Sequence, residues 1–217
     1  MEFDFSPVID YLPVLLQGVG VTLLIGVAVA VMSVVGGQIV AVITLYTRKM
    51  VNWPLRFFIW LFMTTPLLLQ LYFLYFGIGE WILIPAIVVG VLGLGFHYMA
   101  YNADIFIATI KSVSSGQYEA SRSLGFGHLA TLFYVVLPQA FNRALPQLSN
   151  NMIIMVKDIS VLSAIGIGEM VYVSQYAISV TFRPFEFYIT ITVIYYLINL
   201  MMEAGQTWIE RRAAYRS

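Results

Sequence analysis

Residues 11–47 read YLPVLLQGVGVTLLIGVAVAVMSVVGGQIVAVITLYT, a run without a single acidic or basic side chain. Asp10 precedes this run and Arg48 follows it. A helix needs roughly 20 consecutive apolar residues to cross the hydrocarbon core of a bilayer, and this run is longer. The stretch therefore predicts a membrane-spanning helix, and it places the chain among membrane proteins.

The composition of the whole chain agrees with that assignment. Hydrophobic residues make up 60% of the 217 residues and charged residues only 10%, with a mean hydropathy of +0.87. A soluble domain carries about a quarter charged residues. Eleven basic side chains balance eleven acidic ones, so the chain lacks the excess positive charge of a nucleic-acid binder. With no cysteine and two histidines, we expect no metal site.

Four further apolar stretches follow the first. The third extends past Asp104 to Ile110, and the fourth is interrupted by Lys157 and Asp158. We therefore predict an all-α membrane protein with five transmembrane helices in a single domain, residues 1–217. Together with 11–47, the predicted spans are residues 57–79, 81–103 with its extension, 144–167 and 187–202.

The distribution of basic residues predicts the orientation, because cytoplasmic loops of membrane proteins collect Lys and Arg. With five helices, this rule places the N-terminus outside and the C-terminus in the cytoplasm. The N-terminus is acidic and therefore does not resemble a cleavable signal peptide, which begins with basic residues. The cytoplasmic bases are then Arg48, Lys49, Arg56, Lys111, Arg122, Arg143, Arg211, Arg212 and Arg216. The outer side holds Glu2, Asp4, Asp10, Glu80, Glu169 and Glu186, with Arg183 as its only base.

One cytoplasmic segment, about residues 112–143, is longer than the other loops. Ser114 and Gln117 have the spacing of a capping box, which predicts a short helix over 117–124 that ends at Gly125 and Gly127. A second helix is expected over 128–136. Pro138 and Pro146 are expected to bend the chain before it re-enters the membrane. A short surface helix like the one over 117–124 is common on membrane proteins. The length of the whole segment and its two prolines nevertheless favour a rigid docking element.

The residues of this segment resemble a known family. Glu119-Ala120-Ser121, Gly125 and Leu137-Pro138 are similar to the EAA loop of the permease subunits of bacterial ABC importers. Other stretches resemble the polar amino acid subfamily, which includes the histidine, glutamine, arginine and opine permeases, and the similarity covers essentially the whole chain. These stretches are residues 12–18, Thr22-Leu23, 65–70, Ala100-Tyr101, 116–120, 137–140, Leu145-Pro146, 156–160 and 181–185.

The resemblance implies a type I importer domain in the bacterial inner membrane, where a surface coupling helix docks on an ATPase. No Gly-x-x-x-x-Gly-Lys-Ser/Thr motif occurs in the chain, so ATP and Mg are expected on a partner ATPase homodimer, and this chain is expected to be neither an enzyme nor a cofactor carrier. A second permease subunit, an extracytoplasmic solute-binding protein and an amino acid-like substrate are the other implied partners. The implied ATPase-coupling residues are Gly116, Gln117, Glu119, Ala120, Ser121 and Gly125.

Charged residues inside the predicted spans are the candidates for substrate contact, because a charge at the centre of a span costs about 2.5 to 3.5 kcal/mol. Helical rise places Asp104 and Lys157 at similar depths, where an acid and a base could hold an amino acid zwitterion. Lys157 and Asp158 could instead pair with neighbouring helices and hold the bundle together. Thr65 and Tyr101 complete the candidate set, while His97 and Tyr101 also suit a core role.

Several positions depart from the family pattern. Met63 and Ile107 stand where related permeases carry arginine, Trp60 replaces an acid and Ser114 a proline, while Asp104 stands for glutamate. The lost arginines would have gripped a carboxylate in a way that lysine cannot imitate. We therefore hypothesise that this chain pairs with a different permease that carries most of the substrate site.

Two other classes of function remain open. An ion-coupled secondary transporter or channel could use the same intramembrane acid and base, although such proteins often contain inverted repeats and none is visible here. A purely structural subunit of a membrane complex is the second alternative. Dependence of transport on ATP distinguishes an ABC importer from ion-driven uptake.

Overall fold

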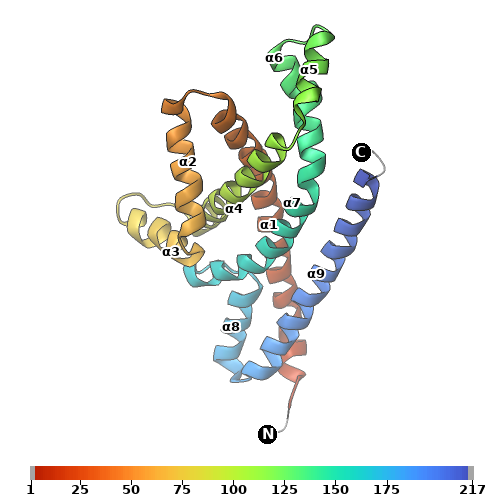
Figure 1. Ribbon diagram of the computed structural model, residues 1–217. Coiled ribbons are helices and arrows are strands. Elements are labelled where there is room, and N and C mark those ends of the chain that lie inside the picture. The colour runs from red at the N-terminus through yellow and green to blue at the C-terminus, as the bar shows by residue number, and fades with distance from the viewer. Residues whose placement is uncertain (1–2, 215–217) are drawn as a thin grey trace.

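The computed structural model describes residues 3–214, with side chains described as far as Trp208. Glu2 and Arg216, two of the charges used to predict orientation, lie outside these residues, as do the side chains of Arg211 and Arg212. Every regular element within the described part is helical, as Figure 1 shows. The prediction of an all-α protein is confirmed.

The first span is one long helix, α1 (Ser6–Tyr46). It includes almost all of the uncharged run and begins five residues before it. Pro13 lies within its apolar length. The helix crosses most of the molecule, from the N-terminal end to the opposite end, where α5 and α6 lie (Figure 1).

The second predicted span is not a continuous helix, so the prediction over 57–79 was wrong in form. Helix α2 (Lys49–Thr64) starts earlier than expected, and α3 (Leu67–Tyr72) continues through a π-helical turn, η1 (Phe73–Gly77), and a 3-10 turn, η2 (Ile78–Glu80). The two halves are bent by 113°. Pro66 accounts for the break, because a proline disfavours helical geometry at the preceding residue, and Thr65 is indeed extended.

The third span is helix α4 (Ala86–Lys111), which follows Pro85 and includes Asp104. The predicted extension to Ile110 is confirmed, whereas the expected start at residue 81 was five residues too early. Residues 81–85 form no helix, and Pro85 fits the start of a helix, where the first N–H groups have no partner within the helix.

The cytoplasmic segment contains α5 (Ser115–Ser123), then α6 (His128–Thr131) and the π-helical η3 (Leu132–Val136). Ser114 precedes α5 but makes no side-chain cap, so the predicted capping box is absent. Helix α7 (Leu137–Asp158) begins well before the expected residue 144 and contains Pro146. Neither Pro138 nor Pro146 breaks the chain, because residues His128–Ile165 form one helical stretch, with Pro138 in the first turn of α7 and Pro146 inside it.

The end of the chain differs most from the prediction. After the 3-10 segment η4 (Ile159–Ile165) comes α8 (Met170–Thr181). Helix α8 was not predicted from the hydropathy of the sequence. Phe182 then adopts left-handed backbone angles, with φ 55°, and turns the chain into α9 (Pro184–Ala214), which is longer than the expected 187–202.

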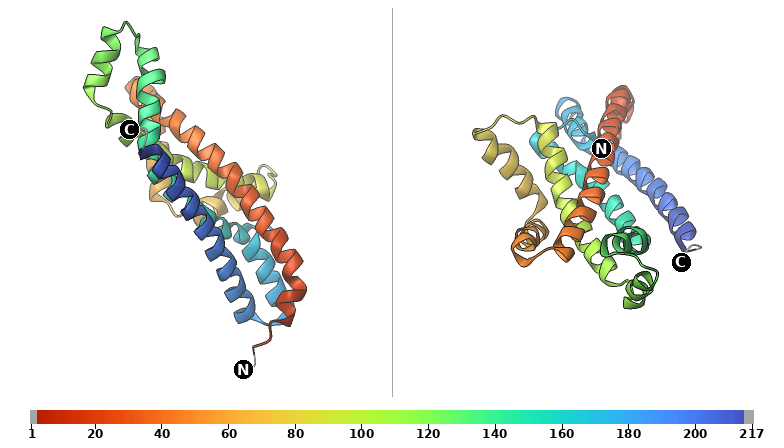
Figure 2. Two further views of the ribbon diagram at one scale, coloured as in Figure 1. Left: turned by 90° about the vertical axis from the view of Figure 1, so that its right-hand side faces the viewer. Right: turned by 90° about the horizontal axis from the view of Figure 1, so that it is seen from above.

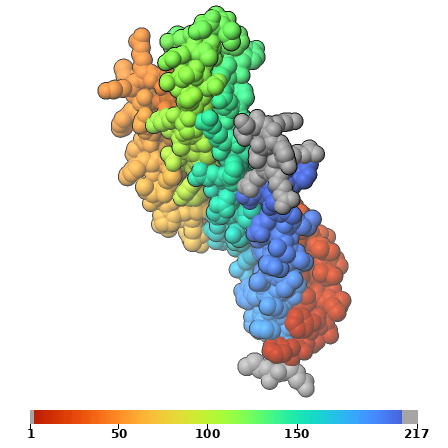
Figure 3. Space-filling model, turned by 45° about the vertical axis from the view of Figure 1, so that its right-hand side comes forward, coloured from red at the N-terminus to blue at the C-terminus, as the bar shows by residue number. Residues whose placement is uncertain are grey.

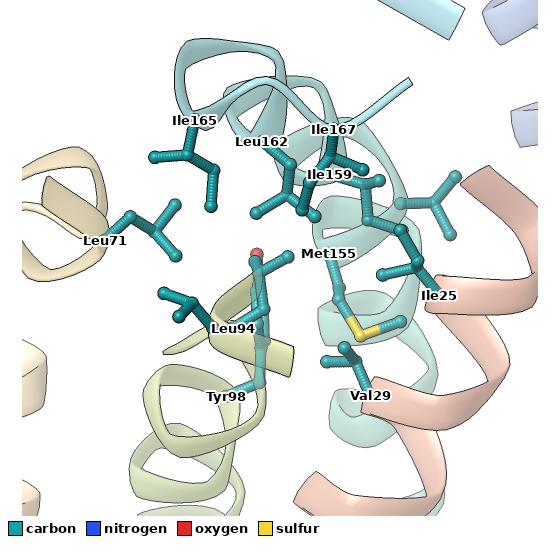
Figure 4. Packing of buried hydrophobic residues seen from close by; sticks show 12 residues of the cluster. Ile25, Val29, Leu71, Leu94, Tyr98, Met155, Ile159, Leu162, Ile165 and Ile167 are labelled. Atoms are coloured by element: carbon teal, nitrogen blue, oxygen red, sulfur yellow. The ribbon is translucent and has the colours of Figure 1, made fainter. Parts of the chain in front are cut away.

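Four stretches of the described chain are long and apolar enough to cross a membrane, and the bent pair of α2 and α3 makes a fifth. The predicted count of five holds when this pair is one span. In the central core, side chains from α1, α3, α4, α7 and η4 meet, as Figure 4 shows. The cores at the two ends join α1 to α4 and α7, and α1 to α8 and α9.

The elements form an elongated bundle (Figure 2). The helices α5 and α6 protrude together from one end, next to the start of α7. The segment around residue 50, orange in Figure 3, also projects from the side of the molecule toward this end.

Candidate coupling surface and intramembrane polar cluster

The protruding helix α5 ends in a hydrogen-bonded glycine turn. Gly125 has a φ of 84°, the N–H of Phe126 donates to the carbonyl of Ser121 at 3.0 Å, and the N–H of Gly125 donates to the carbonyl of Arg122 at 2.9 Å. This pair of bonds is a Schellman motif, for which glycine is favoured because it tolerates left-handed angles. The prediction that Gly125 ends the helix is confirmed.

Side chains tie this end of the molecule to α1 and α7. The hydroxyls of Tyr118 and Tyr46 lie 3.2 Å apart, and Gln139 Nε2 donates to Gln117 Oε1 at 3.2 Å. Arg143 on α7 donates to the carbonyl oxygen of Ser112, just after α4, at 2.6 Å. These bonds connect α5 to the ends of α1 and α7, and they connect α7 to the end of α4.

Most of the predicted coupling residues are exposed on α5. Gly116, Gln117, Glu119, Ala120 and Gly125 are open to solvent. Ser121 is the exception, because it is buried and its hydroxyl donates to the carbonyl of Gln117 at 2.7 Å. Beside them the side chains of Leu124 and Leu129 are 78% and 72% exposed. A rigid helix flanked by exposed leucines is suited to docking on another protein.

The break in the second span is held by a side chain. Gln70 Nε2 donates to the carbonyl oxygens of Phe62 and Thr65, both at 3.0 Å, and to Thr65 Oγ1 at 2.7 Å. These carbonyls lie at the end of α2, where no helical partner follows. Gln70 Oε1 in turn lies 3.0 Å from His97 Nδ1 on α4. His97 is buried, which is consistent with the core role considered for it from the sequence. Sequence reasoning gave Gln70 no role of its own.

The Lys157-Asp158 pair is divided by the fold. Tyr98 on α4 donates its hydroxyl to Asp158 Oδ2 at 2.6 Å, and Asp158 is partly buried. Lys157 is exposed, as is Asp104 on α4, and Tyr101 is partly buried beside His97, with ring centroids 5.1 Å apart. Among the residues that the structure describes, no ion pair joins Asp104 to Lys157.

A second group of hydrogen-bonded polar side chains links α1, α4 and α7. Asn102 donates to Ser33 Oγ and accepts from Asn151 Nδ2, each at 3.2 Å. A Cβ on Gly37 would lie 3.0 Å from the backbone nitrogen of Ala103. The glycine therefore serves close helix packing.

A buried carboxylate lies between α1, α8 and α9. Glu169 has 0% exposure and caps α8 by accepting from the N–H of Tyr172 at 2.7 Å. Its other oxygen accepts from the hydroxyl of Tyr195 on α9 at 3.3 Å. Next to it the N–H of Met170 donates to Thr22 on α1 at 3.4 Å. Sequence reasoning used Glu169 only for orientation, because its surroundings are set by distant helices.

A bundle of spanning helices with polar side chains inside and a rigid helix exposed at one end has the architecture of a transport permease. Residues 33–215 match the family described as the inner membrane component of binding-protein-dependent transport systems. The chain belongs to this family, whose members are permease subunits of ABC transporters and not their ATPases.

Individual relatives support the same assignment. The chain is 32% identical to the probable amino-acid ABC transporter permease protein PatM of Vibrio harveyi, over 98% of this chain and 97% of the relative. It is 30% identical to the glutamine transport system permease protein GlnP of Escherichia coli, over 98% of each chain. The resemblance to the polar amino acid permeases is confirmed.

Solved structures agree. A crystal structure of an amino acid ABC transporter with histidines superimposes with a TM-score of 0.90 at 34% identity, covering 98% of this chain and 100% of that one. An inward-facing methionine transporter, MetNI, has a TM-score of 0.80 at 17% identity over 94% of this chain. At that identity the second likeness shows the fold alone.

Proposed function

We propose that this chain is one of the two membrane-spanning permease subunits of an ATP-driven importer of polar amino acids or their derivatives. An extracytoplasmic binding protein delivers the substrate, and an ATPase homodimer docks on the exposed face of α5. The observation that carries the proposal is the braced coupling end, where Gly125 ends α5 and Tyr118 and Gln117 contact α1 and α7. The amino acid permeases among the relatives support the substrate class.

The bracing suggests how ATP drives the transporter. When the ATPase subunits close, they move α5, and its contacts with Tyr46 and Gln139 pass that movement to α1 and α7. The packed bundle transmits such a shift as a rigid body. The substrate cavity then opens alternately to the two sides of the membrane.

Within the proposed substrate set, the hydrogen bonds separate two groups. Thr65 accepts a hydrogen bond from Gln70, and Asp158 accepts one from Tyr98. These bonds favour a role in holding the helices together over direct contact with the substrate. Asp104 and Lys157 are exposed on spanning segments. Because a charge is costly against lipid, we place this pair at a wet cavity or against the second permease, where Tyr101 also lies near the substrate.

We further propose that the second permease is a different chain, since Met63 and Ile107 replace the arginines expected from the family pattern. The N-terminus lies outside the inner membrane and the C-terminus in the cytoplasm. This orientation puts α5 on the ATPase side and the bases Arg48, Lys111 and Arg143 on the same side.

The direct test is affinity purification through a C-terminal tag from native membranes, followed by mass spectrometry of stoichiometric partners. We expect one ATPase and one different permease. An ATPase with this permease alone would contradict the heterodimer but leave the importer. Reconstituted uptake that continues without ATP and stops when the membrane potential collapses would overturn the importer in favour of ion coupling.

A further inference from the structure

The junction of α1 and α2, together with the first turns of α2, carries a concentration of positive charge apart from the coupling helix α5. We call residues 48–56 the basic elbow. Arg48, Lys49 and Arg56 are all exposed, and within the described part of the chain no carboxylate lies within ion-pair distance of them. Three exposed cations, close together in residues 48–56 and without a carboxylate partner, form a surface that suits an anionic ligand.

Exposed apolar side chains lie among these cations. Met50 is 90% exposed and Trp53 is 68% exposed, while the rings of Trp53 and Phe57 stack with centroids 6.0 Å apart. Tryptophan is enriched where the hydrocarbon of a bilayer meets its headgroups. Bases beside large apolar residues are the composition of a segment that lies in that boundary.

The position of the elbow fits the same boundary. It includes Arg48, which lies between α1 and α2, and the start of α2, and both helices are parts of candidate spans, so we expect this junction at the surface of the bilayer. The tip formed by α5 and α6 extends farther from the bundle than the elbow does (Figure 1). The ATPase is therefore expected on the tip, and the elbow stays beside the lipid.

We propose that the basic elbow binds the phosphate headgroups of anionic phospholipids, with Arg48, Lys49 and Arg56 contacting phosphate and Met50 and Trp53 entering the adjoining acyl region. Basic segments next to a span are attracted to anionic lipid, and each cation contributes about a fivefold gain in affinity. Only the assignment of the elbow to the cytoplasmic leaflet rests on the proposed function.

The test places a photoreactive benzophenone amino acid at position 50 in place of Met50, in the complete transporter reconstituted in nanodiscs of phosphatidylcholine and phosphatidylglycerol. After illumination, mass spectrometry counts the two lipid adducts on this chain. We expect phosphatidylglycerol adducts to exceed the lipid mixing ratio by about fivefold or more. The same probe at Trp81, which is 84% exposed but follows Glu80, should show no such excess.

The combined substitution Arg48→Gln, Lys49→Gln and Arg56→Gln should abolish the excess, whereas Arg122→Gln on α5 should leave it unchanged. Adducts that follow the mixing ratio at position 50 would overturn the proposal, and so would crosslinks from that position to the ATPase in place of lipid. The readout does not depend on transport or on orientation, because nanodiscs carry anionic lipid in both leaflets. It therefore fails or succeeds separately from the proposed function.

Discussion

The hydroxyl of Tyr98 on α4 donates a 2.6 Å hydrogen bond to Oδ2 of Asp158 at the end of α7, between residues 60 positions apart in sequence. Lys157, the neighbour of Asp158, is exposed instead. Adjacent residues on a helix point about 100° apart, so two charges that look like a pair in sequence face different surroundings. Asp158 links two spans, and Lys157 stays open to a partner or substrate.

Removing the hydroxyl in Tyr98→Phe should lower the free energy of unfolding by about 1 to 3 kcal/mol, because Asp158 loses its partner in a partly buried position. Asp158→Asn keeps a carbonyl acceptor for Tyr98 and should cost less while preserving uptake. Thermal unfolding of the purified transporter and uptake into proteoliposomes measure the two effects. Loss of uptake in Asp158→Asn at unchanged thermal stability would instead make Asp158 a substrate contact.

Gly125→Val should assemble in the membrane but uncouple the ATPase from transport. A side chain at a φ of 84° is strained by about 1 to 2 kcal/mol, so the end of α5 should lose its Schellman turn. The measurement is ATP hydrolysis stimulated by the substrate-loaded binding protein. Gly127→Val is the matched control, because Gly127 has a φ of −72° and nothing lies within 4 Å of an added Cβ. Equal coupling in both variants would rule out a role for the turn.

Gly37→Ala should destabilise the bundle by about 1 to 3 kcal/mol, because its Cβ would lie 2.8 Å from Asn102 Cβ and force α1 away from α4. Gly20→Ala in the same helix meets nothing within 4 Å and should be neutral or slightly stabilising, since alanine favours helix over glycine. Thermal unfolding in detergent compares the two variants. A tolerated Gly37→Ala would mean that the two helices separate easily.

Glu169→Ala should lower the midpoint of thermal unfolding markedly, because the N–H of Tyr172 and the hydroxyl of Tyr195 both lose their acceptor inside the bundle. Glu169→Gln retains an acceptor oxygen and adds a donor, so most of the stability should remain. If the glutamine variant is as unstable as the alanine variant, the negative charge of Glu169 has a further role.

Asp104→Ala should leave uptake nearly intact if a different permease carries the main substrate site, whereas changing the equivalent acid of that partner should abolish uptake. Asp104 is exposed on this chain, so the change should alter stability little. Transport assays over a range of substrate concentrations check the prediction. Collapse of uptake in Asp104→Ala alone would place the substrate on this chain.

The sequence by itself determined the class of the protein. Its uncharged runs are long enough to span a bilayer, and hydropathy depends on composition and not on distant contacts, so spans such as α1 could be read directly. The end of α5 was equally local, because Gly125 is the residue that a left-handed turn requires. The EAA loop motif is also a local run of residues, so the sequence alone was enough to indicate the family.

Tertiary structure alone decided how the polar residues inside the membrane are used. Pro66 signals a bend, but it does not show that Gln70, which holds that bend, lies 3.0 Å from His97 on α4. Likewise, the uses of Asp158 and Glu169 depend on Tyr98 and Tyr195 of other helices. Such bonds follow from the angles at which helices cross and the faces they share. These are set by close packing at positions such as Gly37, and no local run of sequence specifies them.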